Sequence, residues 1–177
     1  MARCIAWHNH GLREPYAVEH IIIYNIMHST LNLPSFDVRI KKDDKGRPKI
    51  YDILRRRYIS LTPEEWVRQH FINYLIADKG YPKSLLVNET QLQLGEKKLR
   101  CDSVLLGSDG KPCMIIEYKA PTITLTQKVF DQISVYNMLL HVDYLIVSNG
   151  IQHICCRMDY ESNTYKFLEV IPNFDEL

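Results

Sequence analysis

The sequence contains no apolar run near the roughly 20 residues that a membrane-spanning helix needs. Its N-terminus also lacks the basic-then-apolar order of a secretion signal. The five cysteines are odd in number and include no C-x-x-C pair, so neither a disulfide framework nor a zinc site is indicated. These absences predict a cytoplasmic protein with reduced thiols and no membrane partner.

Several catalytic signatures are missing as well. There is no G-x-x-x-x-G-K-[ST] loop to hold the phosphates of ATP, so this chain is not itself an ATP-driven motor. The seven histidines are scattered and form no H-E-x-x-H, so none is interpreted as a metal ligand. The sequence also has no internal repeat and no low-complexity segment.

What remains is the composition of an ordinary globular domain, with 46% apolar and 24% charged residues in 177. The net charge of +1 gives no overall nucleic-acid signature. Locally, however, residues 37–57 hold nine Lys or Arg against four Asp. This excess either meets phosphate or forms a solvated hairpin surface, and the pattern alone leaves both interpretations open.

Three segments are expected along the chain. Residues 1–33 show no clear periodicity and are interpreted as an N-terminal extension. Residues 34–60 are predicted to form a basic β-hairpin appendage, because "FDVRIKK" and "KIYDILRRRYISL" flank the turn-rich "DDKGRP". Residues 61–177 are then the α/β domain.

The α/β domain is predicted to begin with a helix at Thr62, followed by Pro63 and by Glu65 in capping-box position. Gly80 and Pro82 end this helix. Three strand-like runs follow: "SLLVNETQLQL", "LRCDSVLLG" and "PCMIIEYKA".

A second helix is expected after Thr124 and Gln127, which form another capping-box pattern. Short β-rich runs then surround Asn149 and Gly150, a common hairpin pair. The predicted order is helix, three strands, helix, two or three strands, which indicates an α/β fold whose mixed β-sheet is flanked by helices.

The run "MIIEYK" places charge where a buried strand should continue. Side chains alternate along a strand, so Glu117 and Lys119 share one face. Asp102 lies in the preceding run, which a short turn makes an antiparallel neighbour. Two adjacent carboxylates repel each other unless they share a proton or bind a cation, and Mg²⁺ accepts such oxygen ligands.

Asp102 followed by Glu117-Tyr118-Lys119 resembles the motif of the PD-(D/E)xK nucleases, whose fold is restriction-endonuclease-like. Cys101 stands where that motif has proline. The next helix carries "FDQISVYN", and its Q-x-x-x-Y pattern resembles the N-terminal nuclease domain of type I restriction enzyme R subunits. The resemblance spans roughly residues 60–158.

This resemblance implies roles for the charged residues. Asp102 and Glu117 would be ligands of Mg²⁺, with Mn²⁺ as an alternative ion. Lys119 would position the attacking water or stabilise the transition state. Glu65 would complete the metal shell, or else serve only as the capping-box partner at its helix start.

Three further residues are expected at the DNA. Gln132 and Tyr136, on one helical face, would contact the DNA backbone or brace the catalytic strand, or else form a packed polar pair. Arg68 would approach phosphate from the first helix, or else be solvated surface. The expected partners are DNA and motor or recognition subunits in other chains, with homodimer formation left open.

The predicted function is that of a metal-dependent DNA endonuclease of restriction-modification. The alternative is a noncatalytic nucleic-acid-binding or subunit-docking module that keeps the nuclease fold. A third interpretation is a plain α/β domain whose charged strand lies at an exposed sheet edge, where charge prevents aggregation.

Overall fold

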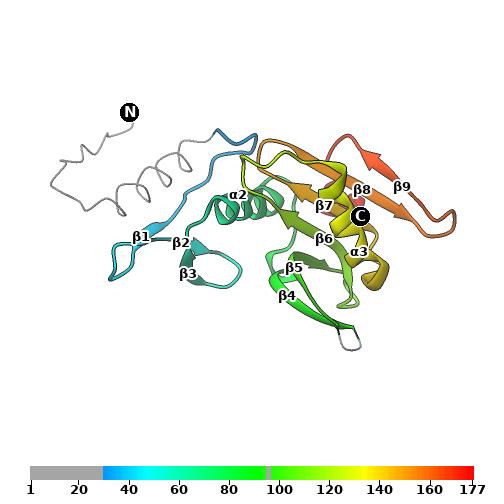
Figure 1. Cartoon of the computed structure of the whole chain (residues 1–177), viewed down its shortest axis with the longest axis horizontal. Coiled ribbons are helices and arrows are strands. Elements are labelled where there is room, and N and C mark those ends of the chain that lie inside the picture. The colour runs from blue at the N-terminus through cyan, green and yellow to red at the C-terminus, as the bar shows by residue number, and fades with distance from the viewer. Residues whose placement is uncertain (1–29, 95–96) are drawn as a thin grey trace.

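The computed structural model describes residues 30–94 and 97–177 (Figure 1). Its elements are β1 (Ile40–Lys42), β2 (Pro48–Asp52), β3 (Arg57–Ser60), α2 (Pro63–Ala77), η1 (Lys83–Leu85), β4 (Leu86–Leu94), β5 (Lys97–Leu106), β6 (Pro112–Tyr118), α3 (Gln127–Leu140), β7 (Tyr144–Ser148), β8 (His153–Asp159), β9 (Thr164–Leu168) and η2 (Phe174–Glu176). Among these described residues, no helix is long and apolar enough to cross a membrane.

The first three strands form a small antiparallel sheet in the order β1-β2-β3. The expected hairpin is present as β1 and β2, and β3 extends it with a third strand. Ile50 on β2 packs with Leu61 and with Trp66 of α2, so the inner face of this sheet is attached to the helix.

The larger sheet has the order β4-β5-β6-β7-β8-β9 within the described residues. Strands β6 and β7 run parallel, and the other neighbours are antiparallel. Helix α3 makes the crossover that a parallel pair requires. The predicted α/β class with a mixed sheet is therefore confirmed. Because β6 lies between β5 and β7, the exposed-edge interpretation of its charges is wrong.

The two helices cover opposite faces of the larger sheet. Phe71 of α2 packs in one cluster with Ile116 of β6. Ile133 of α3 packs in another cluster with Ile115 of the same strand. Alternation along the buried strand β6 thus supplies both cores.

The helix starts agree only in part with expectation. The side chain of Thr62 caps α2 by accepting from the backbone N–H of Glu65 at 3.1 Å, as predicted. Helix α3, in contrast, has Thr126 at its N-cap, two residues later than the expected Thr124.

Residues 1–29, most of the expected N-terminal extension, lie outside the described residues. Its last part contacts the fold: Leu31 and Leu33 pack against the main core. The backbone N–H of Asn32 also donates to the carbonyl of Gly150 over 2.7 Å. The expected boundaries at residues 33 and 60 stay predictions.

Candidate active site

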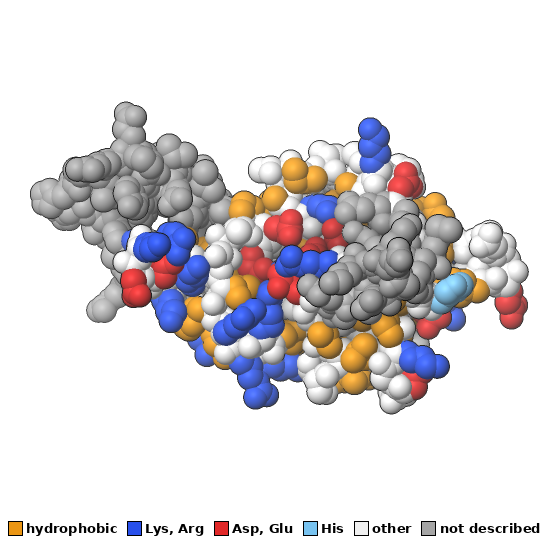
Figure 2. Space-filling model, turned by 60° about the horizontal axis from the view of Figure 1, so that its bottom comes forward, with side chains coloured by type: hydrophobic (Ala, Val, Ile, Leu, Met, Phe, Trp, Pro, Cys, Tyr) orange, Lys and Arg blue, Asp and Glu red, His pale blue; other side chains and the backbone are white. Residues whose placement is uncertain are grey.

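Asp102 and Glu117 lie on adjacent strands and line one cleft of about 590 Å³. Its wall is built from β3, the start of α2 and strands β4, β5 and β6. The lining residues are Arg55, Arg57, Ile59, Ser60, Thr62, Glu64, Glu65, Arg68, Glu89, Arg100, Asp102 and Glu117. Figure 2 shows Asp and Glu side chains gathered in the middle of this face, bordered by Lys and Arg.

Strand register brings the expected centre together. Ser103 of β5 pairs with Ile116 of β6, so the next residues along the two strands are Asp102 and Glu117. The backbone N–H of Tyr118 donates to Asp102 Oδ2 over 2.9 Å and holds that carboxylate at the end of the ladder.

Lys119 joins this pair, because its Nζ donates to Glu117 Oε1 over 2.7 Å. Burial raises the pKa of Glu117, and the charge of Asp102 raises it further, while Lys119 opposes both. Burial alone would lower the pKa of Lys119, but its hydrogen bond to Glu117 makes the net shift upward. The structure thus places the three residues side by side, with like charges close enough to affect each other.

Arg68 lies beneath the carboxylates with a side chain only 4% exposed. Its Nη2 is 2.8 Å from Asp102 Oδ1, and its Nη1 is 2.6 Å from Glu65 Oε2. Although burial disfavours the charge, these carboxylates raise the pKa of Arg68. Arg68 is therefore an internal counter-ion rather than a solvated surface residue, and its contact with nucleic acid stays a prediction.

Glu65 does not complete a capping box. Its Oε2 accepts from Arg68 at 2.6 Å, and its Oε1 accepts from Gln69 Nε2 at 2.8 Å. The carboxylate is thus turned away from the backbone donors of its own helix start. Burial raises its pKa. Its place in a metal shell stays a prediction, but because both oxygens are already hydrogen-bonded we expect Mg²⁺ to bind without it.

Glu64 was not among the predicted site residues, yet it lies nearer than Glu65 to the open side of the cleft. Its side chain is 46% exposed, and Arg68 Nη2 is 3.6 Å from its Oε1. Burial and the charge of Asp102 both raise its pKa. The sequence feature that could have indicated Glu64 is the pair of consecutive glutamates, Glu64 and Glu65, in the first turn of the helix.

Glu89 is a second residue that the sequence did not reveal. Its φ of 52° is left-handed, and the β4–β5 ladder has register pairs on either side of it but none at Glu89 itself. The carboxylate receives Arg55 Nη1 at 2.6 Å and Arg100 Nη2 at 2.6 Å. Such a backbone distortion places another acidic group, with its two cations, on the cleft wall.

Gln132 and Tyr136 lie on α3, as expected. Their side chains fall outside the described part of the structure, so their contact with DNA stays a prediction.

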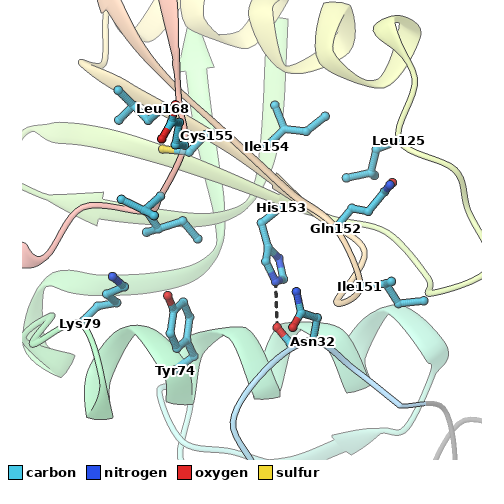
Figure 3. Close-up of a pocket in the computed structure, with 13 residues that line it drawn as sticks. Asn32, Tyr74, Lys79, Leu125, Ile151, Gln152, His153, Ile154, Cys155 and Leu168 are labelled. Atoms are coloured by element: carbon cyan, nitrogen blue, oxygen red, sulfur yellow. Dashed lines mark hydrogen bonds between the residues drawn. The ribbon is translucent and has the colours of Figure 1, made fainter.

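A second hollow of about 580 Å³ lies between α2 and β8 (Figure 3). His153 contacts Asn32 O through Nε2 at 3.1 Å and Ser148 Oγ through Nδ1 at 2.8 Å. Burial lowers the pKa of this histidine. Its ring therefore serves to attach the segment before β1, and the hollow lacks the clustered carboxylates of the first cleft.

The donor set of the first cleft suits a hard cation held by few protein ligands. In the described ranges, no group of three His, Cys, Asp or Glu side chains is arranged to hold a metal ion. Mg²⁺, however, is commonly bound by one or two carboxylates, with water and substrate phosphate completing its shell. Asp102 and Glu117 fit that smaller set, and the charge of Asp102 raises the pKa of Glu117.

The comparisons with known proteins concern the same region. No curated protein matches the chain. Among solved structures, the fragment structure of a putative HsdR subunit of a type I restriction enzyme from Vibrio vulnificus YJ016 is 18% identical with a TM-score of 0.49. The alignment covers 66% of this chain and 24% of that chain, so the present chain corresponds to about a quarter of its length.

The family comparison covers more than half of the chain. Residues 63–172, from α2 to the end of the larger sheet, match the model described as type I restriction enzyme R protein N terminus. This match includes both strands of the candidate site. The chain therefore belongs to the family of the type I restriction enzyme R protein N terminus.

Proposed function

We propose that this chain is a metal-dependent DNA endonuclease domain that hydrolyses phosphodiester bonds with the Asp102 cleft as its centre. The observation that carries the proposal is that Asp102 and Glu117 line one cleft and that Lys119 is hydrogen-bonded to Glu117 beside it. Family membership supports it, because the family name belongs to a restriction enzyme subunit.

Asp102 and Glu117 would hold a Mg²⁺ ion in this proposal. Each carboxylate oxygen can accept more than one contact, so the bonds from Arg68 and Tyr118 leave Asp102 with capacity for a cation. When bound, the ion polarises a phosphoryl oxygen and lowers the pKa of a bound water. Arg68 keeps Asp102 fixed in place from below.

Lys119 would stabilise the negative charge that develops on the phosphate. An ammonium group has three N–H donors, and Glu117 accepts one of them. The other two are available to a water or to a phosphate oxygen. The raised pKa of Lys119 keeps this group positively charged at neutral pH.

The partners follow from the same proposal. DNA is the substrate, and because these 177 residues contain no ATP-binding loop of the Walker type, an ATP-driven motor would lie outside them. Recognition subunits would direct the domain to its sites. Homodimer formation would allow both strands to be cut.

Cleavage of supercoiled plasmid and linear duplex with Mg²⁺ or Mn²⁺ tests the proposal. We expect nicking that requires the metal and is lost in both Asp102→Asn and Lys119→Ala. Matched controls are Asp175→Asn and Lys166→Ala, exposed residues of the same types on η2 and β9. Both controls should cleave like the natural protein.

Folded protein that binds DNA but leaves it intact with either metal would contradict catalysis by the isolated chain. It would favour the noncatalytic binding or docking module. Equal cleavage by Asp102→Asn and the natural protein would instead mean that the cleavage arises elsewhere.

A further inference from the structure

The small sheet β1–β3 has an outer face with a composition unlike its inner face. Residue pairing places Ile40, Ile50 and Ile59 on the side that packs toward α2. By alternation, the opposite side carries cations and tyrosines. We call this side the outer face, and it consists of Arg39, Lys41, Lys49, Tyr51, Tyr58 and Ser60.

The two tyrosines hold two of these cations in place. The guanidinium of Arg39 lies 3.7 Å from the centroid of the Tyr51 ring, and Lys41 Nζ lies 4.4 Å from that of Tyr58. The rings themselves meet edge to face, with centroids 5.2 Å apart. Arg39 and Lys41 are nonetheless exposed. Their charges are thus fixed above the sheet while remaining open to a ligand.

Two lysines on this face oppose each other. Lys41 pairs directly with Lys49 in the β1–β2 register. Like charges in opposed positions destabilise an antiparallel pair. Asp43 offsets this in part, because Lys49 Nζ is 3.7 Å from its Oδ2, but Arg47 binds the same oxygen at 2.9 Å. A bound polyanion would relieve the remaining repulsion.

The outer face borders the acidic cleft at Ser60. Lys49 Nζ donates to Ser60 Oγ over 2.9 Å, and Ser60 lines the cleft together with Arg57. Ser60 is thus the point at which the outer face borders the cleft, whereas Arg57 lies on the side of Ile59. Figure 2 shows Lys and Arg side chains beside the group of Asp and Glu side chains.

The chemistry of this face does not suit a lipid surface. Peripheral membrane binding needs apolar side chains beside the cations. The large hydrophobic side chains exposed among the described residues all lie elsewhere, from Val87 onward. The regularly spaced phosphates of a nucleic-acid backbone fit fixed, exposed cations without such anchors.

We propose that the outer face of β1–β3 binds the phosphodiester backbone of duplex DNA and leads it into the Asp102 cleft. Arg39 and Lys41 contact phosphates, and the tyrosines act as positioning residues for these cations. The inference rests on the proposed function for its substrate, but binding and cleavage are measured separately.

The test measures the binding of a labelled mixed-sequence duplex by fluorescence anisotropy. The titrations are made in EDTA at a series of salt concentrations. Without divalent ions the nuclease is silent, so failure of the proposed cleavage leaves this measurement unaffected. In Arg39→Gln/Lys41→Gln we expect binding to weaken by about tenfold or more, and the slope of log K against log salt to shrink by about 2, one for each lost phosphate contact.

The matched control is Lys83→Gln/Lys166→Gln, which removes the same charge from exposed positions on η1 and β9. Its affinity and salt slope should stay close to those of the natural protein. Tyr51→Leu keeps every charge but removes the ring below Arg39, and should weaken binding by about threefold. Thermal melting checks that each variant is folded.

Equal weakening by both double variants would overturn the proposal, because net charge rather than this face would then govern binding. Unchanged binding in Arg39→Gln/Lys41→Gln, with cleavage retained, would overturn it while leaving the proposed function intact. Binding to phosphatidylserine vesicles in preference to duplex, lost in the same variant, would assign the face to a membrane and also overturn it.

Discussion

The guanidinium of Arg68 reaches from α2 to Asp102 on β5, with Nη2 2.8 Å from Oδ1. On its other side it binds Glu65 at 2.6 Å. One buried cation thus connects the helix to the strand that carries the candidate site. The same contact serves stability and the placement of the site.

Arg68→Met should lower the free energy of unfolding by about 3–5 kcal/mol, because it leaves buried carboxylates without their cation. Urea denaturation followed by tryptophan fluorescence measures the change. Arg56→Met, an exposed arginine before β3, should stay within about 0.5 kcal/mol of the natural protein. Adding Glu65→Leu to Arg68→Met should recover part of the loss. A loss as small as that of Arg56→Met would contradict the counter-ion role.

Substitution of Glu64 should affect metal binding, and substitution of Glu65 should affect stability. Glu64→Gln is expected to weaken Mg²⁺ binding by about tenfold, since it removes a carboxylate close to the proposed ion. Its unfolding free energy should change little. Glu65→Gln should instead cost about 1–3 kcal/mol of stability, because Arg68 loses a charged partner, and leave Mg²⁺ affinity intact.

Calorimetric titration and urea denaturation of both variants test this assignment. The reversed pattern, in which Glu65→Gln loses the ion and Glu64→Gln the stability, would assign the metal to Glu65.

His153 should contribute stability that depends on pH. Its burial lowers its pKa below the usual 6.5, so the folded state binds this proton less readily than the unfolded state. The contribution is present above about pH 6.5 and is lost as the pH falls from there through the folded pKa, at up to about 1.4 kcal/mol per pH unit. The unfolding free energy of His153→Asn should therefore fall less between about pH 8 and about pH 5 than that of the natural protein. Parallel pH profiles would contradict this.

Gly150→Ala should destabilise the chain by more than Gly46→Ala. Both glycines have positive φ, 82° and 75°, so both substitutions carry backbone strain. A Cβ at Gly150 would also lie 2.8 Å from Leu31 Cδ2, whereas nothing lies within 4 Å at Gly46. We expect a difference of about 1–3 kcal/mol in unfolding free energy.

Leu31→Ala removes the side-chain atoms of Leu31 that the added Cβ would contact. If the clash is the cause, Gly150→Ala should cost less in a Leu31→Ala background than in the natural protein. Equal costs in the two backgrounds would leave backbone strain and the contact with Val67 Cγ2, 3.1 Å from the added Cβ, as the causes.

The element order was predictable because local signals and long-range pairing agree. Thr62 and Pro63 mark the start of α2, and the short turn before Pro112 makes β5 and β6 antiparallel neighbours. The third strand of the small sheet was missed for the opposite reason. Its turn contains Arg56 with a φ of 53° rather than a glycine, asparagine or proline that would have marked a break.

Which candidate residues share one face of a strand was predictable from the sequence. The rotation of helix α2 about its own axis was not. Alternation fixes that Glu117 and Lys119 share a side. It cannot decide which of two consecutive glutamates is buried and which is exposed, because that depends on how Trp66 and Phe71 pack and thereby orient α2. Glu89 likewise needed its left-handed backbone, which no local residue type announces.

The position of β6 has a consequence for local motion. In a strand that is paired on both sides, each amide donates to one of the two neighbouring strands, and exchange requires that part of the sheet to open. The amides around Ile116 should therefore be among the slowest to exchange with deuterium. Glu117 therefore lies in a segment for which we expect a high opening free energy.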